Sequence, residues 1–120
     1  MNTDGLIEYA YEAYGVRPEY LWKRYPDYCV LRHQGSRKWF AVLMEVPKSS
    51  LGLPGEGMAQ IMNVKCEPIL LGSLLRSPGF LPAWHMNKEN WLSVLLGGSV
   101  PDNDVISLLE MSYNMTLGKK

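Results

Sequence analysis

The fold is decided by residues 28–44, which read YCVLRHQGSRKWFAVLM. Side chains fall into two alternating sets over residues 28–33 and again over 39–44, and this period of two is typical of β-strands. The residues between them, Gln34–Arg37, include Gly35 and Ser36, which favour a turn. Two such strands joined by a short turn predict an antiparallel hairpin.

A third strand is predicted downstream of the hairpin, at Ala59–Cys66. It follows a loop at Pro47–Gly57 that is rich in glycine and proline. Alternation along this strand separates an apolar face from a polar one. These faces carry Met62, Val64 and Cys66 on one side, and Asn63 and Lys65 on the other.

Helices are predicted before, within and after this series of strands. The first begins at an N-cap on Thr3 and ends at Gly15, where glycine readily adopts the left-handed conformation. A short apolar helix follows Glu67-Pro68, and the last helix opens at Pro101, because proline is tolerated in a first turn. Helical spacing gives the last helix an apolar stripe of Val105, Leu108, Leu109, Tyr113 and Leu117.

Two further strands are predicted at Phe80–Met86 and Trp91–Leu96. Pro82 has no N–H for a sheet ladder, so the former is expected at an edge. The element order is therefore α-β-β-β-α-β-β-α. This order predicts an α+β fold, a two-layer sandwich of an antiparallel sheet with N- and C-terminal helices. The chain of 120 residues is expected to form a single domain over residues 1–120.

Charge is balanced overall but unevenly distributed along the chain. Twelve basic residues match twelve acidic ones, which excludes a domain that holds nucleic acid or anionic membranes mainly by bulk charge. Residues 16–48 nevertheless carry seven basic and three acidic side chains, a net charge of +4 that coincides with the hairpin. Any nucleic-acid contact is therefore expected to be local and weak.

The N-terminal residues and the two cysteines predict a cytoplasmic protein. Residues 1–15 contain acidic side chains and no basic one, unlike a signal peptide, and the apolar stretches are too short to span a bilayer. Cys29 and Cys66 are far apart and form no C-x-x-C motif, so a buried, reduced pair is expected. No membrane association is predicted.

Five short motifs occur in order along the chain. They are Lys38-Trp39-Phe40-Ala41, Asn63-Val64-Lys65-Cys66-Glu67-Pro68, His85-Met86-Asn87-Lys88-x-x-Trp91, Gly97-Gly98-Ser99-Val100-Pro101-Asp102 and Ser112-Tyr113. Together they resemble the MmcQ/YjbR-like family over Leu6 to Leu117. The resemblance implies a frataxin-like fold and a small intracellular bacterial protein, with a DNA-binding role assigned by structural analogy.

The candidate DNA-binding residues come from the hairpin and from the third of these motifs. They are Arg32, Arg37, Lys38, Asn87 and Lys88. Cations near a hairpin turn can contact phosphates, and Trp91 could stack on a base. The alternatives are a solvated hairpin tip, an Asn87 that caps a turn, a Lys88 that points to water and a Trp91 that belongs to the core.

No metal, cofactor or catalytic centre is predicted. Cys29 and His33 lie four residues apart on one strand, about 13 Å at the rise of a strand, which is too far to share an ion. His85 and Cys66 have no evident partner either. The acidic stripe of Asp4, Glu8 and Glu12 fits a solvated helix face.

These patterns predict a noncatalytic binding module rather than an enzyme. The expected partner is DNA, bound weakly and in a salt-sensitive manner. The alternative is a protein-interaction or adaptor domain that uses an aromatic surface patch. The positions of Tyr20, Trp22, Tyr25 and Trp84 discriminate between the two, because an exposed aromatic patch without flanking cations favours a protein partner.

Overall fold

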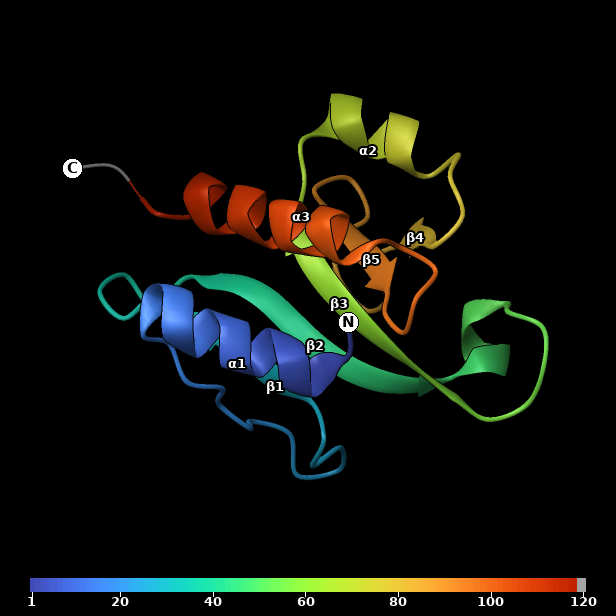
Figure 1. The fold of residues 1–120 in the computed structure, drawn as a ribbon, viewed down its shortest axis with the longest axis horizontal. Helices are drawn as coiled ribbons and strands as arrows, with labels where there is room; N and C mark the ends of the chain where they lie inside the picture. The colour runs from blue at the N-terminus through green and yellow to red at the C-terminus, as the bar shows by residue number, and fades with distance from the viewer. Residues whose placement is uncertain (119–120) are drawn as a thin grey trace.

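The computed structural model describes residues 1–118 and contains a five-stranded antiparallel sheet in the order β1-β2-β3-β5-β4 (Figure 1). The elements are α1 (Thr3–Tyr14), β1 (Cys29–Arg32), β2 (Trp39–Pro47), the 3-10 helix η1 (Lys48–Leu51), β3 (Met58–Lys65), α2 (Pro68–Leu74), β4 (Phe80–Pro82), β5 (Trp91–Leu95) and α3 (Asp102–Met115). The predicted α+β class and element order are confirmed, and η1 is an addition within the predicted loop.

Helices α1 and α3 lie beside each other across one face of the sheet (Figure 1). Beneath them is the larger core, in which Leu6, Phe40, Met62, Leu92 and Leu109 are fully buried. The two helices are joined at the surface by Tyr9, whose hydroxyl donates a 2.6 Å hydrogen bond to Glu110. Burial of this helix-covered face forms the two layers of the fold.

The opposite face of the sheet is covered by side chains from loops. A smaller apolar cluster of Val30, Val42, Met44, Val46 and Ile61 is buried there. Trp22, Tyr28, Trp84 and Met86 pack over this cluster from the segments before β1 and after β4. This face of the sheet is thus covered mainly by aromatic side chains, whereas the other face is covered by helices.

Several predicted details differ from the observed ones. Asn2, not Thr3, caps α1, because its side-chain oxygen accepts a 2.9 Å hydrogen bond from the Gly5 N–H. Gly15 ends the helix at φ 68°, as predicted. Leu117 lies beyond the end of α3 and is about half exposed, so its predicted place in the apolar stripe is wrong. The helix ends earlier because Thr116 leaves the helical conformation.

The polar face of β3 is buried in part. Asn63 is fully buried, and its side-chain nitrogen donates to the Trp84 carbonyl at 2.9 Å. Ser93 on β5 donates to the Asn63 side-chain oxygen and accepts from the Trp84 N–H. This network holds the loop after β4 against the sheet and supplies the partners that buried polar groups require.

The edge position predicted from Pro82 is confirmed, since β4 is the outermost strand beside β5. It is shorter than expected and covers only Phe80–Pro82. Among residues 1–118, each helix is too short or too polar to cross a membrane.

Candidate functional site

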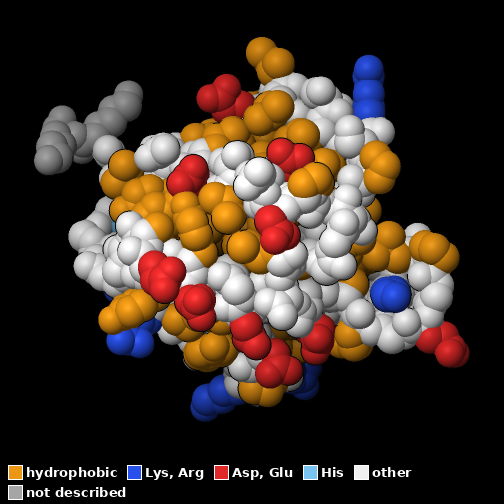
Figure 2. Space-filling view, viewed as in Figure 1, with side chains coloured by type: hydrophobic (Ala, Val, Ile, Leu, Met, Phe, Trp, Pro, Cys, Tyr) orange, Lys and Arg blue, Asp and Glu red, His pale blue; other side chains and the backbone are white. Residues whose placement is uncertain are grey.

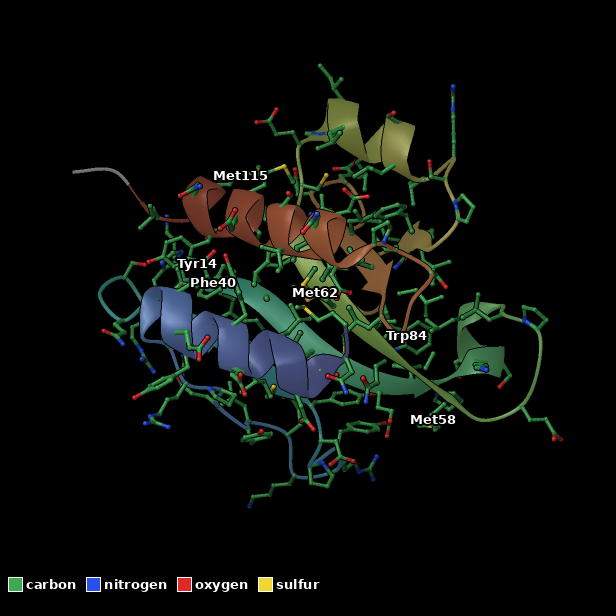
Figure 3. All side chains as sticks on the ribbon, viewed as in Figure 1. Tyr14, Phe40, Met58, Met62, Trp84 and Met115 are labelled. Carbon is green, nitrogen blue, oxygen red and sulfur yellow. The ribbon has the colours of Figure 1, made fainter. Side chains whose placement is uncertain are left out.

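A shallow groove lies at the end of the sheet where β2 and β5 begin and β3 ends. Its volume is about 370 Å³. The lining residues are Lys38, Trp39, Lys65, Trp91, Met115 and Thr116. Figure 3 shows Met115 at the far end of α3, which closes one side of the groove. Three elements of the sheet and one helix therefore contribute to a single concave surface.

Ser112 of α3 shapes this end of the sheet. Its buried hydroxyl donates to the Phe40 carbonyl at 2.6 Å and accepts from the Lys65 N–H at 2.8 Å. The ladder between β2 and β3 extends only to the pair Ala41 and Val64. Ser112 therefore bridges the two strands where their own pairing stops, and it fixes the backbone from which the Lys65 side chain departs.

A second buried contact supports the groove from below. Thr116 donates its hydroxyl proton to the Ser112 carbonyl at 2.7 Å, so it must accept a hydrogen bond from the His33 Nε2, 2.8 Å away. Burial lowers the pKa of His33, which favours the neutral ring. The contact with Thr116 then assigns the remaining ring proton to Nε2. His33 thereby links the end of β1 to the floor of the groove.

Aromatic and cationic side chains both line the groove. Trp39 and Trp91 are half-buried, so each keeps part of its ring accessible. The Lys65 Nζ lies 5.9 Å from the centre of the Trp91 ring, at the outer limit of a cation–π contact. Lys38 is exposed at the start of β2. The surface offers flat apolar rings beside ammonium groups.

A third lysine stands close to this groove in the chain. Lys88 is exposed in the turn that leads into β5, three residues before Trp91. Asn87 builds this turn, since its side-chain oxygen accepts from the Glu89 N–H at 2.8 Å and its carbonyl accepts from the Trp91 N–H at 2.9 Å. Of the two roles predicted for Asn87, capping of a turn and contact with DNA, the structure shows the capping role. A contact of this residue with DNA stays a prediction.

The two lysines of the groove, and Lys88 in the turn before β5, are free of carboxylate partners within the described chain. Ion pairs among residues 1–118 involve the N-terminus, Arg32 and Arg37, and none involves Lys38, Lys65 or Lys88. Free ammonium groups beside aromatic rings can bind an anion without first breaking an internal ion pair. The groove is therefore the basic region best prepared for an anionic ligand.

The two predicted arginines are in a different position. Both contact Glu19: the Arg32 guanidinium makes bonds of 2.6 and 3.1 Å to its carboxylate, and Arg37 makes one of 3.1 Å. The hydrogen bond from Arg32 holds the pKa of Glu19 below its ordinary value. The structure joins these arginines to each other through Glu19 and places neither of them in the lining of the groove.

The helix-covered face is acidic. Figure 2 shows Asp and Glu side chains over this face, with Lys and Arg toward its rim. The carboxylates on α1 and α3 are Asp4, Glu8, Glu12, Asp102, Asp104 and Glu110. This face would repel a polyanion.

The residues considered for metal or covalent chemistry are dispersed. Among the described residues, no three His, Cys, Asp or Glu side chains gather closely enough to hold a metal ion. Cys29 and Cys66 are both buried free thiols, and burial raises the pKa of Cys29 to about 11. Cys29 is therefore held as a thiol, which is a poor nucleophile.

Sequence reasoning missed three residues that form or support this groove. Lys65 was assigned to a polar face of β3 without a role, Trp39 to a strand, and Ser112 only to a motif. One signal was present: Trp39 and Trp91 each open a strand, and Lys38 directly precedes one of them. The bridge made by Ser112 depends on how α3 crosses β2 and β3, which residue patterns do not reveal.

Comparisons with known proteins agree with this architecture. A family model described as YjbR matches residues 11–115. The uncharacterised protein YyaQ of Bacillus subtilis is 35% identical over 116 residues, covering 97% of this chain and 98% of the relative.

Solved structures also match. A Pseudomonas syringae protein determined by crystallography is 40% identical, with a TM-score of 0.94 over 97% of this chain and 99% of the other. A Deinococcus radiodurans protein at 19% identity has a TM-score of 0.72 over 98% of this chain and 80% of the other, which shows similarity of fold alone.

Proposed function

Because the chain belongs to the YjbR family, whose matched relative YyaQ is uncharacterised, we propose a function from the groove itself: a noncatalytic module that binds DNA weakly. The observation that carries the proposal is a pair of lysines beside two half-buried tryptophans, with no carboxylate in ion-pair distance of either lysine among residues 1–118. Lys38 and Lys65 line the groove with Trp39 and Trp91. Cationic rims around aromatic platforms suit nucleic acids, since phosphates meet the charges and bases meet the rings.

Only a few lysines are available to contact phosphates, and their number sets the affinity expected for DNA. Three lysines predict a salt slope of about −2 for a single strand and about −3 for a duplex. An apparent Kd in the tens to hundreds of micromolar at low salt is on the order expected from so few contacts. Raising the salt from about 50 to 200 mM should therefore weaken binding by about 16-fold for a single strand and about 64-fold for a duplex.

A fluorescence anisotropy titration tests this function. Labelled single-stranded and duplex oligonucleotides are titrated at about 50 and 200 mM salt, with the wild type and with Lys65→Gln. Lys23→Gln is the matched control, because Lys23 is exposed in the connector before β1 and does not line the groove. We expect the Lys65 variant alone to lose affinity and salt slope. The absence of binding to either DNA at several hundred micromolar protein would contradict the proposal.

The noncatalytic character and a cytoplasmic location belong to the same proposal. Support for the former comes from the raised pKa of Cys29 and from His33, whose Nε2 is engaged by Thr116. The two free thiols support a reducing compartment. The likeness to frataxin stays a prediction of the family resemblance.

A second candidate function is adhesion to a protein through the connector before β1. Tyr20 and Tyr25 are 58% and 49% exposed, whereas Trp22 and Trp84 pack on the sheet. Lys23 and Arg24 flank the exposed tyrosines, so the patch has the neighbouring cations that weaken a purely apolar docking surface. Substituting both tyrosines by serine should leave DNA binding unchanged if the groove is the site. If the double tyrosine variant lost as much DNA affinity as Lys65→Gln, the interface would lie on the connector instead.

A further inference from the structure

We propose that the groove selects single-stranded DNA over duplex by stacking an unpaired base against Trp39 or Trp91 while Lys38, Lys65 and Lys88 meet the flanking phosphates. This inference rests on the proposed DNA-binding function and names the form of DNA that the site takes. It is carried by the placement of both rings inside the groove rather than on a projecting surface.

The size and shape of the groove fit one nucleotide. Its volume of about 370 Å³ falls at the small end of ligand pockets, which range from about 300 to 1,000 Å³. Both tryptophans are recessed, since each is half-buried against the end of the sheet. A recessed ring can stack only on a base that leaves its helical stack. Duplex DNA hides its bases and would have to unpair and unstack one of them first, which weakens its binding.

The surfaces that could serve a duplex are unsuited to one. The turn at Gln34–Arg37 projects as a wing would, but its Arg37 is bonded to Glu19. The helix-covered face bears carboxylates (Figure 2). Three lysines alone make few of the phosphate contacts on which duplex affinity depends. Base stacking, which contributes on the order of ten- to a hundredfold in affinity per base, is therefore the larger source of affinity available here.

The negative groups near the groove indicate which side of it a base would occupy and which side the phosphates would occupy. The end of α3 contributes Met115 and Thr116 to the lining, and helix C-termini carry partial negative charge. The Ser112 carbonyl there already accepts the Thr116 hydroxyl, which removes one free acceptor. A neutral base suits this side of the groove, and the phosphates suit the lysine side. Glu67 and Glu89 are exposed neighbours of Lys65 and Lys88 in sequence and reduce the local charge.

Chemically matched ligands separate stacking from charge in the unmodified protein. Three probes of equal length are titrated: a thymidine hexamer, an abasic hexamer with the same phosphates, and a six-base-pair duplex closed by a non-nucleotide linker so that it stays paired at low salt. We expect the thymidine hexamer to bind about tenfold more tightly than the abasic strand and more tightly than the duplex. Equal binding of the thymidine and abasic strands, or a preference for the duplex, overturns the inference and leaves the DNA-binding function standing. Failure of all three to bind overturns both.

Variants and a non-nucleic-acid probe complete the test. Trp91→Leu keeps an apolar side chain and should reduce thymidine affinity to that of the abasic strand, and Trp39→Leu should act in the same direction. Tyr20→Leu is the matched control, since Tyr20 is exposed and lies outside the groove. If a tryptophan variant fails to fold, quenching of tryptophan fluorescence in the wild type by thymidine but not abasic DNA replaces it. An acidic peptide of equal charge that binds as tightly as thymidine DNA contradicts base recognition.

Discussion

Arg37 and Lys38 are adjacent in the sequence, yet they belong to two basic regions with opposite electrostatic character. On the β1 edge, Arg37 and Arg32 share the carboxylate of Glu19. In the groove, Lys38 and Lys65 lie beside tryptophan rings and have no carboxylate within ion-pair distance among the described residues. The arginines of the β1 edge are engaged in ion pairs within the protein, whereas the lysines of the groove remain accessible to a ligand.

The difference shows why a count of charges along the chain is a poor guide to a binding surface. The segment at residues 16–48 has a net charge of +4, but Glu19 neutralises part of it in three dimensions. Lys65, which lies outside this segment, joins the groove through strand pairing instead. Available charge depends on which cations lack partners, and the fold determines that.

The largest expected effect concerns the hydrogen bonds of Ser112 that support the groove. Ser112→Ala leaves the Lys65 N–H and the Phe40 carbonyl without their buried partner. We expect the free energy of unfolding to fall by about 2–3 kcal/mol. Urea denaturation measures it, with Ser107→Ala, exposed on the same helix, as control. Equal stability of the two variants would show that the bridge is dispensable.

The next largest effect compares the two regions directly. Lys38→Gln with Lys65→Gln should weaken single-stranded DNA binding about tenfold at low salt, because two phosphate contacts are lost. The double variant Arg32→Gln and Arg37→Gln removes the same formal charge but only cations that Glu19 already holds. Anisotropy should show at most a twofold change for it. Comparable losses in both double variants would erase the distinction between the regions.

A smaller effect is expected from pH, through the residue that connects the two regions. The pKa of His33 in the folded protein lies below the unfolded value of about 6.5. Between these two pKa values the unfolded chain therefore binds more protons than the folded protein does. Stability should therefore fall as pH drops below about 6.5, by at most about 1.4 kcal/mol per pH unit.

His33→Gln keeps a donor toward Thr116 without a titratable ring, and it should flatten this part of the thermal stability profile. His85→Gln is the control because His85 is exposed. An unchanged profile in His33→Gln would assign the pH dependence to other groups.

The smallest expected effect comes from freeing the arginines of the β1 edge, so that this region resembles the groove in having unpaired cations. Glu19→Gln removes the carboxylate that holds both arginines, so they become available to phosphates. We expect about a threefold gain in affinity for single-stranded DNA and a steeper salt slope. Glu12→Gln, exposed on α1, makes the same change in net charge elsewhere and should have less effect. Equal gains would mean that only net charge matters.

Much of the fold follows from local patterns, whereas the groove does not. Period-two alternation predicts the hairpin, Pro82 predicts the edge strand, and Gly15 predicts the end of α1. The network of Asn63 and the bridge of Ser112 depend on long-range contacts between elements that are far apart in sequence.

The candidate site was predictable only in part for the same reason. Lys38 could be singled out because it stands at the hairpin. Lys65 could not, because its position beside Trp91 arises from the pairing of β3 with β5. The ion pair between Arg32 and Glu19 joins a strand to an irregular connector, and no pattern of spacing predicts such a contact.

DNA is proposed to bind at the groove and not at the β1 edge. Mapping backbone amide chemical shifts of the labelled protein during titration with a thymidine decamer tests it in the unaltered chain. We expect the largest shifts at Lys38, Trp39, Lys65 and Trp91, with small shifts at Glu19 and Arg32. Shifts concentrated at the Gln34–Arg37 turn or on the helix-covered face would contradict it.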